Sequence, residues 1–203
     1  MRRGNVKLRR QLAQEAARLM YEEEVAQYFV AKRMAAKRLF GRAGGRKMRF
    51  RPADLPSNGE IQEALLALAD LVEGDQRFIR LREMRQLAFD IMEPLERFEP
   101  RLIGSVATGH IRRGSDIDIQ LFAEDRDAPE GALQALGWTY ERDDVLIRRP
   151  DGWHEYLHLR LDRANPIELT VYPRHDLRRR PRSSTDGKPM LRLKLAEVAA
   201  LLR

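Results

Sequence analysis

The stretch Arg101 to Ala123, RLIGSVATGHIRRGSDIDIQLFA, decides how the rest of the chain is interpreted. It opens on apolar residues, passes through a glycine-containing loop and ends in an alternating segment that carries Asp116 and Asp118. Successive side chains of a strand point to opposite faces, so these two carboxylates share a face, with their Cα atoms about 7 Å apart. Carboxylates this close repel each other unless a cation lies between them. The spacing therefore predicts a magnesium site, because Mg²⁺ takes oxygen ligands and borrows several from a phosphate substrate.

The loop before the aspartates is suited to phosphate binding. Gly104 allows the backbone to approach a ligand closely. Ser105 is expected to open a short helix whose free N–H groups, together with the serine hydroxyl, favour a phosphate. Arg112 and Arg113 lie just before the carboxylates and would neutralise further phosphate charge. The stretch thus contains both halves of a site for metal-assisted phosphoryl chemistry.

These residues carry a resemblance to a known superfamily. Gly104-Ser105, ten intervening residues and then Asp116-Ile117-Asp118-Ile119 resemble the signature of the DNA polymerase β-like nucleotidyltransferases, and in detail its minimal nucleotidyltransferases. The resemblance extends from Glu99 to about Tyr172. It implies a mixed sheet flanked by helices, two Mg²⁺ ions or Mn²⁺ in their place, and a nucleoside triphosphate such as ATP. The implied reaction transfers a nucleoside monophosphate to an acceptor.

The resemblance also implies a third carboxylate on a later strand. The segment PIELTVYP, residues 166–173, alternates, so that its apolar residues face a core while Glu168 points to the other face. Glu168 matches the expected position, where it would complete the acceptor-side metal site and take a proton. Asp162 is the alternative third carboxylate. Lys188, in a loop near the C-terminal end, is a further candidate for contact with the triphosphate.

The amino-acid composition limits which classes of protein this chain could belong to. The 203 residues suffice for one domain or two small ones. The absence of cysteine excludes disulfides and thiolate metal sites and fits a cytoplasmic protein. No apolar run approaches the length of a membrane span, and the N-terminal residues lack an apolar signal core, so we expect a soluble protein without a membrane partner. Neither composition nor pattern indicates an oligomeric state.

The basic character of the chain is concentrated at its start. Residues 1–51 hold 15 Lys and Arg against 4 Asp and Glu. Apolar residues at three- and four-residue spacing predict one long helix from about Asn5 to Phe40. The basic residues between positions 32 and 51 form either a solvated helix face or a surface for RNA. Both interpretations stay open at this point.

Two further helices precede the glycine-containing loop. Ser57 and Glu60 form a capping-box pattern at the start of a helix over residues 58–72. A second helix is expected over residues 75–97, with Pro94 shortening or bending it. The chain is therefore predicted to be α+β, with a helical region over residues 1–98 and a nucleotidyltransferase domain over residues 99–203.

Two strand predictions concern the segment after the glycine-containing loop. Trp138–Tyr140 and Val145–Ile147 are expected to form a hairpin that turns at Asp143-Asp144. Residues 154–162 alternate, which predicts a strand with His158 on a wet, polar face from which it would touch substrate.

The sequence favours a Mg²⁺-dependent nucleotidyltransferase whose hydroxyl acceptor is an RNA, a protein or a small molecule. The alternative is a nucleotide-sensing or antitoxin-like regulatory module that binds RNA or protein without transfer. Three acids on one face favour catalysis, since binding alone does not need them.

Overall fold

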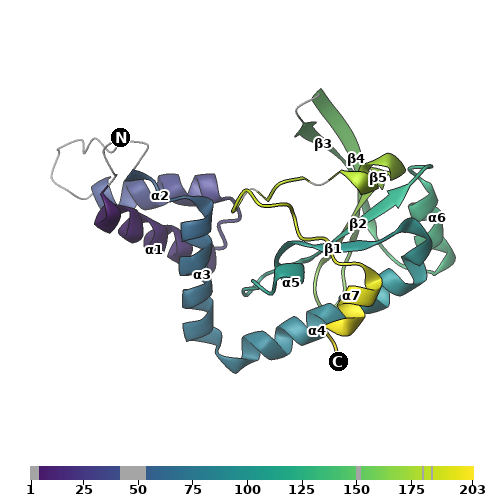
Figure 1. Ribbon diagram of the computed structural model, residues 1–203, viewed down its shortest axis with the longest axis horizontal. Coiled ribbons are helices and arrows are strands. Elements are labelled where there is room, and N and C mark those ends of the chain that lie inside the picture. The colour runs from purple at the N-terminus through teal and green to yellow at the C-terminus, as the bar shows by residue number, and fades with distance from the viewer. Residues whose placement is uncertain (1–4, 42–53, 150–151, 180, 184) are drawn as a thin grey trace. The chain divides into compact units, whose positions relative to one another are not determined.

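The computed structural model describes residues 5–41, 54–149, 152–179, 181–183 and 185–203 (Figure 1). Within them the chain forms two compact units. The helical unit contains the described residues up to Arg77, together with residues 112–114 and the described part of 183–188. The sheet unit contains residues 78–111, the described part of 115–182, and residues 189–203. The helix that begins at Asp75 therefore belongs mostly to the sheet unit.

The helical unit is built from α1 (Val6–Glu22), α2 (Tyr28–Gly41) and α3 (Asn58–Glu73). The side chain of Asn5 caps α1 by accepting a hydrogen bond from the backbone N–H of Leu8. The predicted capping box of Ser57 and Glu60 is confirmed at the start of α3. Apolar residues from all three helices form one core, which includes Leu12, Leu19, Ala31, Ala35 and Ile61.

The prediction of one helix over residues 5–40 is wrong. The helix ends at Glu22, Glu24 has a positive φ of 54°, and a new helix begins at Tyr28. Three consecutive glutamates, Glu22 to Glu24, stand at this break. Negative charge is unfavourable at the C-terminal end of a helix, where the dipole is itself negative, so this run weakens any continuation. The break lets α2 pack against the same core as α1.

The sheet unit opens with α4 (Asp75–Met92), which passes into the 3₁₀ helix η2 (Glu93–Phe98). The expected shortening at Pro94 is confirmed, since proline cannot donate the hydrogen bond that would continue an α-helix. The strands are β1 (Arg101–Ile103), β2 (Ile117–Ala123), β3 (Glu141–Arg149), β4 (Gly152–Leu161) and β5 (Ile167–Pro173). The remaining helices are α5 (Gly104–Thr108), α6 (Ala128–Ala135), η3 (Arg174–Arg178) and α7 (Leu195–Ala200).

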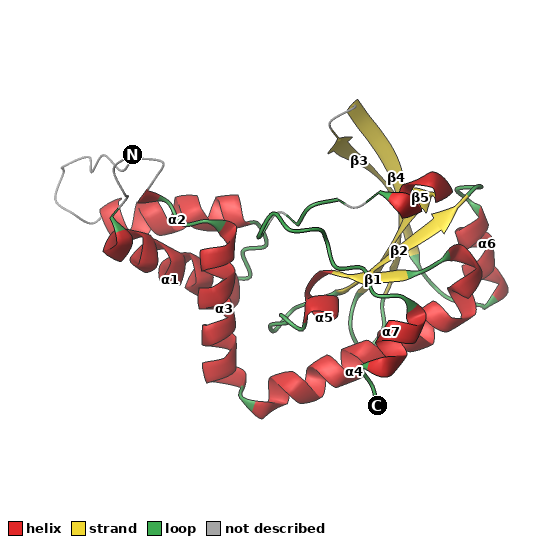
Figure 2. Ribbon diagram, viewed as in Figure 1, coloured by secondary structure: helices red, strands yellow, loops and turns green. Residues whose placement is uncertain are grey.

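The strands form one five-stranded sheet in the order β1-β2-β5-β4-β3 (Figure 2). β2 and β5 are parallel, and every other neighbouring pair is antiparallel. The chain is therefore α+β, with a helical N-terminal region followed by a mixed sheet flanked by helices, as predicted.

One face of the sheet is apolar. Alternate residues of β2, β4 and β5 are buried there, and α4, α6 and α7 contribute to the same core; its strand residues include Ile117, Ile119, Leu157, Leu159, Leu161, Ile167, Leu169 and Val171. The alternation fixes the other set of side chains, Asp118 and Glu168 among them, on the opposite face. No helix in the described ranges is long and apolar enough to cross a membrane.

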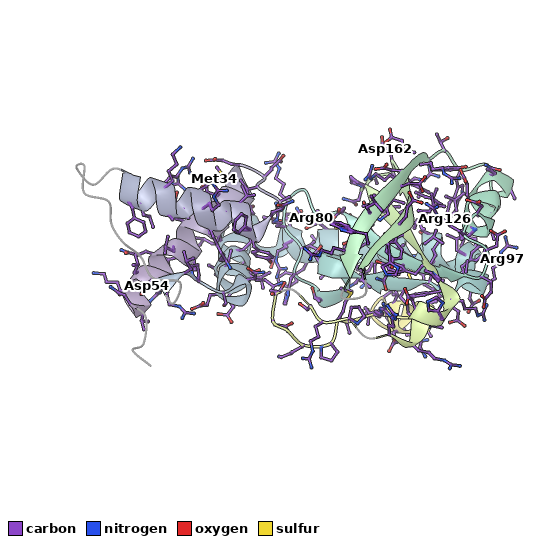
Figure 3. All side chains as sticks on the ribbon, turned by 90° about the horizontal axis from the view of Figure 1, so that it is seen from above. Met34, Asp54, Arg80, Arg97, Arg126 and Asp162 are labelled. Atoms are coloured by element: carbon purple, nitrogen blue, oxygen red, sulfur yellow. The ribbon has the colours of Figure 1, made fainter. Side chains whose placement is uncertain are left out.

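The predicted hairpin at Asp143-Asp144 is wrong. Glu141 to Arg149 is one continuous strand, in which Asp143 pairs with His158 and Asp144 with Leu157 of β4. Cations from neighbouring segments accommodate the two aspartates within the strand. Arg160 lies 3.3 Å from Asp143, and Arg126 (labelled in Figure 3) is ion-paired with Asp144. Local turn propensity is thus outweighed by the pairing of the whole segment with β4, and the exposed ion pairs compensate the charges of the two aspartates.

Candidate active site

The carboxylates predicted for the site come together at one end of the sheet. Asp118 of β2 and Glu168 of β5 are register partners in the parallel pair, so their side chains stand side by side on the polar face. Asp116 directly precedes the first residue of β2 and is exposed. The fallback candidate Asp162 (labelled in Figure 3) follows the last residue of β4 and is also exposed. The register pairs Asp118 with Glu168 and with no other acid.

Gly104 brings the backbone against Asp118. Its φ is 69°, in the left-handed region that side chains rarely adopt. A Cβ at this position would overlap Oδ2 of Asp118 and lie 3.2 Å from its Cγ. The short helix α5 that Gly104 begins is held from α4, where Nε of Arg85 donates to the carbonyl oxygen of Val106 at 3.2 Å. A glycine is therefore required here, and the space it leaves is filled by the aspartate carboxylate.

Asp118 has a strongly raised pKa. Burial is the largest cause that raises its pKa, and repulsion from Asp116 and Glu168 raises it further, to about 7. A carboxyl group with this pKa is protonated or ionised near neutral pH according to whether a cation compensates it. The three acids are thus close enough to oppose one another's charge.

Glu168 has the opposite shift. The contact with His158 is the largest cause that lowers its pKa, and Arg160 adds to the effect, while partial burial opposes it. Nδ1 of His158 lies 2.9 Å from Oε1 of Glu168, and Nε of Arg160 lies 3.5 Å from Oε2. Glu168 is consequently ionised more readily than an ordinary glutamate, next to an aspartate that is ionised less readily.

A cleft of about 710 Å³ opens beside the carboxylates within the sheet unit. Asp116 and Glu168 lie on its wall, with Arg160 and Asp162. Further lining comes from the segment that leads into β3 and from the turn between β4 and β5, namely Thr139, Tyr140, Glu141, Arg163 and Pro166. The cleft places polar and charged groups of both signs within reach of Glu168.

The predicted cationic phosphate ligands lie in the other unit. Arg112 donates from Nη1 to the carbonyl oxygen of Met20 at 2.9 Å, and the backbone N–H of Arg113 donates to Glu73 at 3.1 Å. Lys188 also belongs to the helical unit. The three carboxylates belong to the sheet unit, so a role of Arg112, Arg113 and Lys188 toward a nucleotide stays a prediction.

The basic segment is described only as far as Gly41, and its residues 42–51 lie outside the described ranges. Within α2, Nζ of Lys32 donates to Asn58 at 2.7 Å, and Arg38 is ion-paired with Glu15 and Glu23. These two cations hold helices together. Arg33 and Lys37 are exposed.

The predicted surroundings of His158 are wrong. The sequence pattern indicates a wet strand face, but the residue is only 7 % exposed. His158 and Arg160 both follow from the alternation of β4, which places them on the polar face. Their contact with Glu168 depends on the pairing of β4 with β5, and the sequence pattern contains no signal for that register.

The donor set fits a divalent cation, although not as a preformed cage. Mg²⁺ prefers carboxylate oxygens and needs only one or two from the protein when phosphates supply others. Asp116 and Asp118 meet this requirement. Among the described residues, however, no group of three or more His, Asp or Glu side chains has an arrangement that could hold a metal ion by itself.

Comparison with known proteins gives only remote similarities. No family model matches the sequence, and no curated protein matches it. A solved structure of a cytoplasmic RNA terminal U-transferase has 20 % identity and a TM-score of 0.32, over 44 % of this chain and 28 % of that chain. The structure of the GLD-2/RNP-8 complex has 16 % identity and a TM-score of 0.30, over 47 % of this chain and 42 % of that chain. The chain thus spans less than half the length of either, and the likeness at these scores carries no functional argument.

Proposed function

We propose that this chain transfers a nucleoside monophosphate from a nucleoside triphosphate to a hydroxyl acceptor, with Mg²⁺ or Mn²⁺ as the cofactor. The observation that carries the proposal is the pairing of Asp118 with Glu168 across β2 and β5, with Asp116 near enough to raise the pKa of Asp118. A structural role for this cluster is poorly supported, because repulsion from Asp116 and Glu168 makes the charge of the partly buried Asp118 unfavourable for stability. A cation would relieve that repulsion.

Each residue has a defined part in the proposed reaction. Asp116 and Asp118 would hold the cation, which when bound would neutralise phosphate charge and acidify the attacking hydroxyl. Gly104 and Ser105 would contact the phosphates. Glu168 would complete the acceptor side and take the proton of the hydroxyl. The acceptor oxygen would form a bond to the α-phosphorus as the bond to the bridging oxygen of pyrophosphate breaks, and pyrophosphate would leave with the electron pair.

The cleft beside Glu168 is the proposed place for the acceptor. Its volume of about 710 Å³ lies within the roughly 300 to 1,000 Å³ of small-ligand sites. The acceptor class is RNA, a protein side chain or a small molecule, and the fold alone does not select among them. Arg163 and Tyr140 on the cleft wall supply a cation and an aromatic ring for its recognition.

A second candidate is nucleotide binding without transfer, as in a sensing or antitoxin-like module. The observation that favours it is the engagement of both oxygens of Glu168 by His158 and Arg160. A glutamate whose two carboxylate oxygens are both contacted in this way is as suited to a binding surface as to catalysis.

Labelled transfer distinguishes the two functions. The purified protein is incubated with Mg²⁺ and each α-³²P nucleoside triphosphate, with and without total RNA, lysate protein and small-molecule fractions. We expect label in one acceptor class with the native protein and none with Asp118→Asn. The matched control is Asp90→Asn, which changes an exposed aspartate of α4 whose described partner is Gln86. Transfer that persists in Asp118→Asn would exclude the proposed mechanism, and nucleotide binding without any transfer would establish the second candidate.

A further inference from the structure

Glu168 is contacted from two sides by groups of unequal strength. Arg160, on the Oε2 side, has a side chain that is 45 % exposed and also approaches Asp143 at 3.3 Å. His158, on the Oε1 side, comes closer, at 2.9 Å, and its side chain is only 9 % exposed. An electrostatic contact is weakened less by solvent when it is buried. The orientation of the Glu168 carboxylate is therefore set mainly by His158.

The sheet register explains how His158 reaches Glu168. Arg160 is the direct cross-strand partner of Glu168, and His158 is the partner of Thr170. His158 thus lies diagonally across from Glu168 on the same face, a separation that an imidazole can span. Two positions earlier on that face, Tyr156 is buried and its ring centroid lies 4.7 Å from that of Tyr172. This aromatic pair closes the sheet face on the side of His158 away from the carboxylates.

The surroundings of His158 provide few other polar partners. In the part of the chain that the structure describes, neither ring nitrogen has a partner in hydrogen-bond geometry. The approach of Nδ1 to Glu168 has the distance of an ion pair without the angles of a hydrogen bond. Catalytic hydrogen bonds are often poorly aligned in ligand-free structures and become aligned when substrate binds. Among the described residues, the ion-pair contact of this buried ring is with Glu168, a candidate catalytic acid, and the ring also lies near enough to Asp118 to oppose the rise of its pKa. His158 is therefore placed to act through the carboxylates.

We propose that His158 is a positioning residue, which donates Nδ1–H to Oε1 of Glu168 and fixes the carboxylate beside Asp118. This inference rests on the proposed transfer reaction, whose acceptor-side acid is Glu168. An ionised carboxylate accepts about four hydrogen bonds or ligands. One donor on Oε1 therefore leaves lone pairs free for the acceptor hydroxyl. Without His158, the side chain would keep its weaker, exposed contact with Arg160 and would turn toward solvent.

Substitutions of His158 distinguish a role in positioning Glu168 from a role in packing the sheet. His158→Leu removes the donor and keeps an apolar side chain in the buried site, whereas His158→Asn keeps an N–H donor near the position of Nδ1. The matched control is His154→Leu, which lies on the same face of β4 four residues earlier and stacks on Tyr156. Partners that orient a reactive carboxylate typically account for roughly 10- to 100-fold in activity. We expect a loss of that size in kcat for His158→Leu, little change in the KM of the nucleotide, recovery in His158→Asn, and no loss in His154→Leu.

A second measurement tests the contact without catalysis. Exchange with water is slowed further when a buried imidazole N–H is also hydrogen-bonded, so ¹H–¹⁵N spectra of uniformly labelled protein should show an Nδ1–H resonance of His158 that depends on Glu168. We expect this resonance in the native protein and its loss in Glu168→Ala. Its absence from the native spectrum, or its persistence in Glu168→Ala, would overturn the positioning role even if transfer is found. Equal kcat in His158→Leu and the native protein would overturn it as well. Failure of the transfer proposal is recognised separately, by undiminished activity of Asp118→Asn.

Discussion

Glu60 in the helical unit and Asp118 in the sheet unit each stand at the start of a regular element, yet their pKa values move in opposite directions. Glu60 accepts a hydrogen bond from Arg9 at 2.6 Å, the largest cause that lowers its pKa, and another from the backbone N–H of Ser57 at 2.7 Å. Asp118 meets burial and two further carboxylates, which raise its pKa. The charge of Glu60 therefore stabilises the fold, whereas the charge of Asp118 opposes it, and the proposed cation would offset that charge. The contrast distinguishes the carboxylates of the sheet unit, on which the proposed reaction depends, from those that cap helices.

Among substitutions that leave the three carboxylates unchanged, the largest effect on transfer is expected from Gly104→Ala. The new Cβ would collide with Oδ2 of Asp118 and displace the carboxylate. Displacements of about 1 Å at a reacting centre can lower the rate roughly 100-fold, so we expect a loss of transfer of this order in initial-rate measurements.

Gly137→Ala distinguishes the effect of this collision from the effect of backbone strain. Gly137 has a φ of 68°, close to that of Gly104, and nothing lies within 4 Å of the place that a Cβ would occupy there. Both variants should lose about 1 to 2 kcal/mol of stability, the usual penalty for a left-handed residue that carries a side chain. Only Gly104→Ala should lose transfer. Equal activities in the two variants would mean that the approach of Gly104 to Asp118 has no functional consequence.

The second prediction concerns the stability of the protein without metal. The folded protein holds a proton on Asp118 up to a pH of about 7, while the unfolded chain releases it near the ordinary value of 3.8. The contribution to stability is therefore full below the unfolded pKa and is lost as the pH rises through about 7. We expect the free energy of unfolding, measured with urea in EDTA, to fall by up to a few kcal/mol between about pH 5 and pH 8.

Asp118→Asn should flatten that dependence and make the metal-free protein more stable than the native one at about pH 8, while the proposed reaction predicts that this variant loses transfer. Glu60→Gln tests a carboxylate whose contribution to stability has the opposite pH dependence. The lowered pKa of Glu60 contributes stability that is present above the unfolded pKa and is lost as the pH falls. If the native protein and Asp118→Asn showed the same pH profile of stability, the assignment of the raised pKa to Asp118 would be wrong.

The structural features that could be predicted from the sequence are those that depend on local periodicity. The alternation in IDIQLFA and PIELTVYP placed Asp118 and Glu168 on the polar face of two strands, and the structure pairs them. Burial of Ile117, Leu169 and their neighbours on the other face follows from the same period of two. Gly104 has a positive φ and lies against Asp118, while its expected approach to a phosphate ligand stays a prediction.

What the sequence could not predict depends on long-range pairing or on competing charges. The break after Glu22 reflects three like charges at a helix end, which the apolar periodicity does not register. Asp143 and Asp144 remain within β3 because the whole segment pairs with β4, and Arg160 and Arg126 compensate their charges. The contact of His158 with Glu168 requires the register of β4 against β5, and no local pattern specifies it.

A smaller effect is expected from the charges that hold the helical unit together. Ser57→Ala removes the N-cap of α3, and such losses typically lower stability by about 1 kcal/mol. Arg9→Ala should weaken the same helix start, because Arg9 binds the capping residue Glu60. Thermal unfolding should detect both changes, while transfer per folded molecule stays at the native level. The control is Arg10→Ala, an exposed neighbour on α1. A selective loss of transfer in Ser57→Ala would show that the helical unit contributes to the reaction itself.

The smallest expected effect tests whether α2 also binds RNA. Lys32 and Arg38 are engaged by Asn58, Glu15 and Glu23, whereas Arg33 lies over the ring of Phe29 and Lys37 is exposed. Arg33 and Lys37 are therefore better suited to contact phosphates. Each phosphate contact adds about 0.9 to the slope of the logarithm of the binding constant against the logarithm of salt concentration. The double variant Arg33→Ala/Lys37→Ala should therefore reduce that slope by no more than about 2. Lys32→Ala/Arg38→Ala should lower stability and leave the slope unchanged. The reverse result would mean that the two engaged cations exchange their protein partners for RNA, and the charges of the helical unit would then serve binding as well as folding.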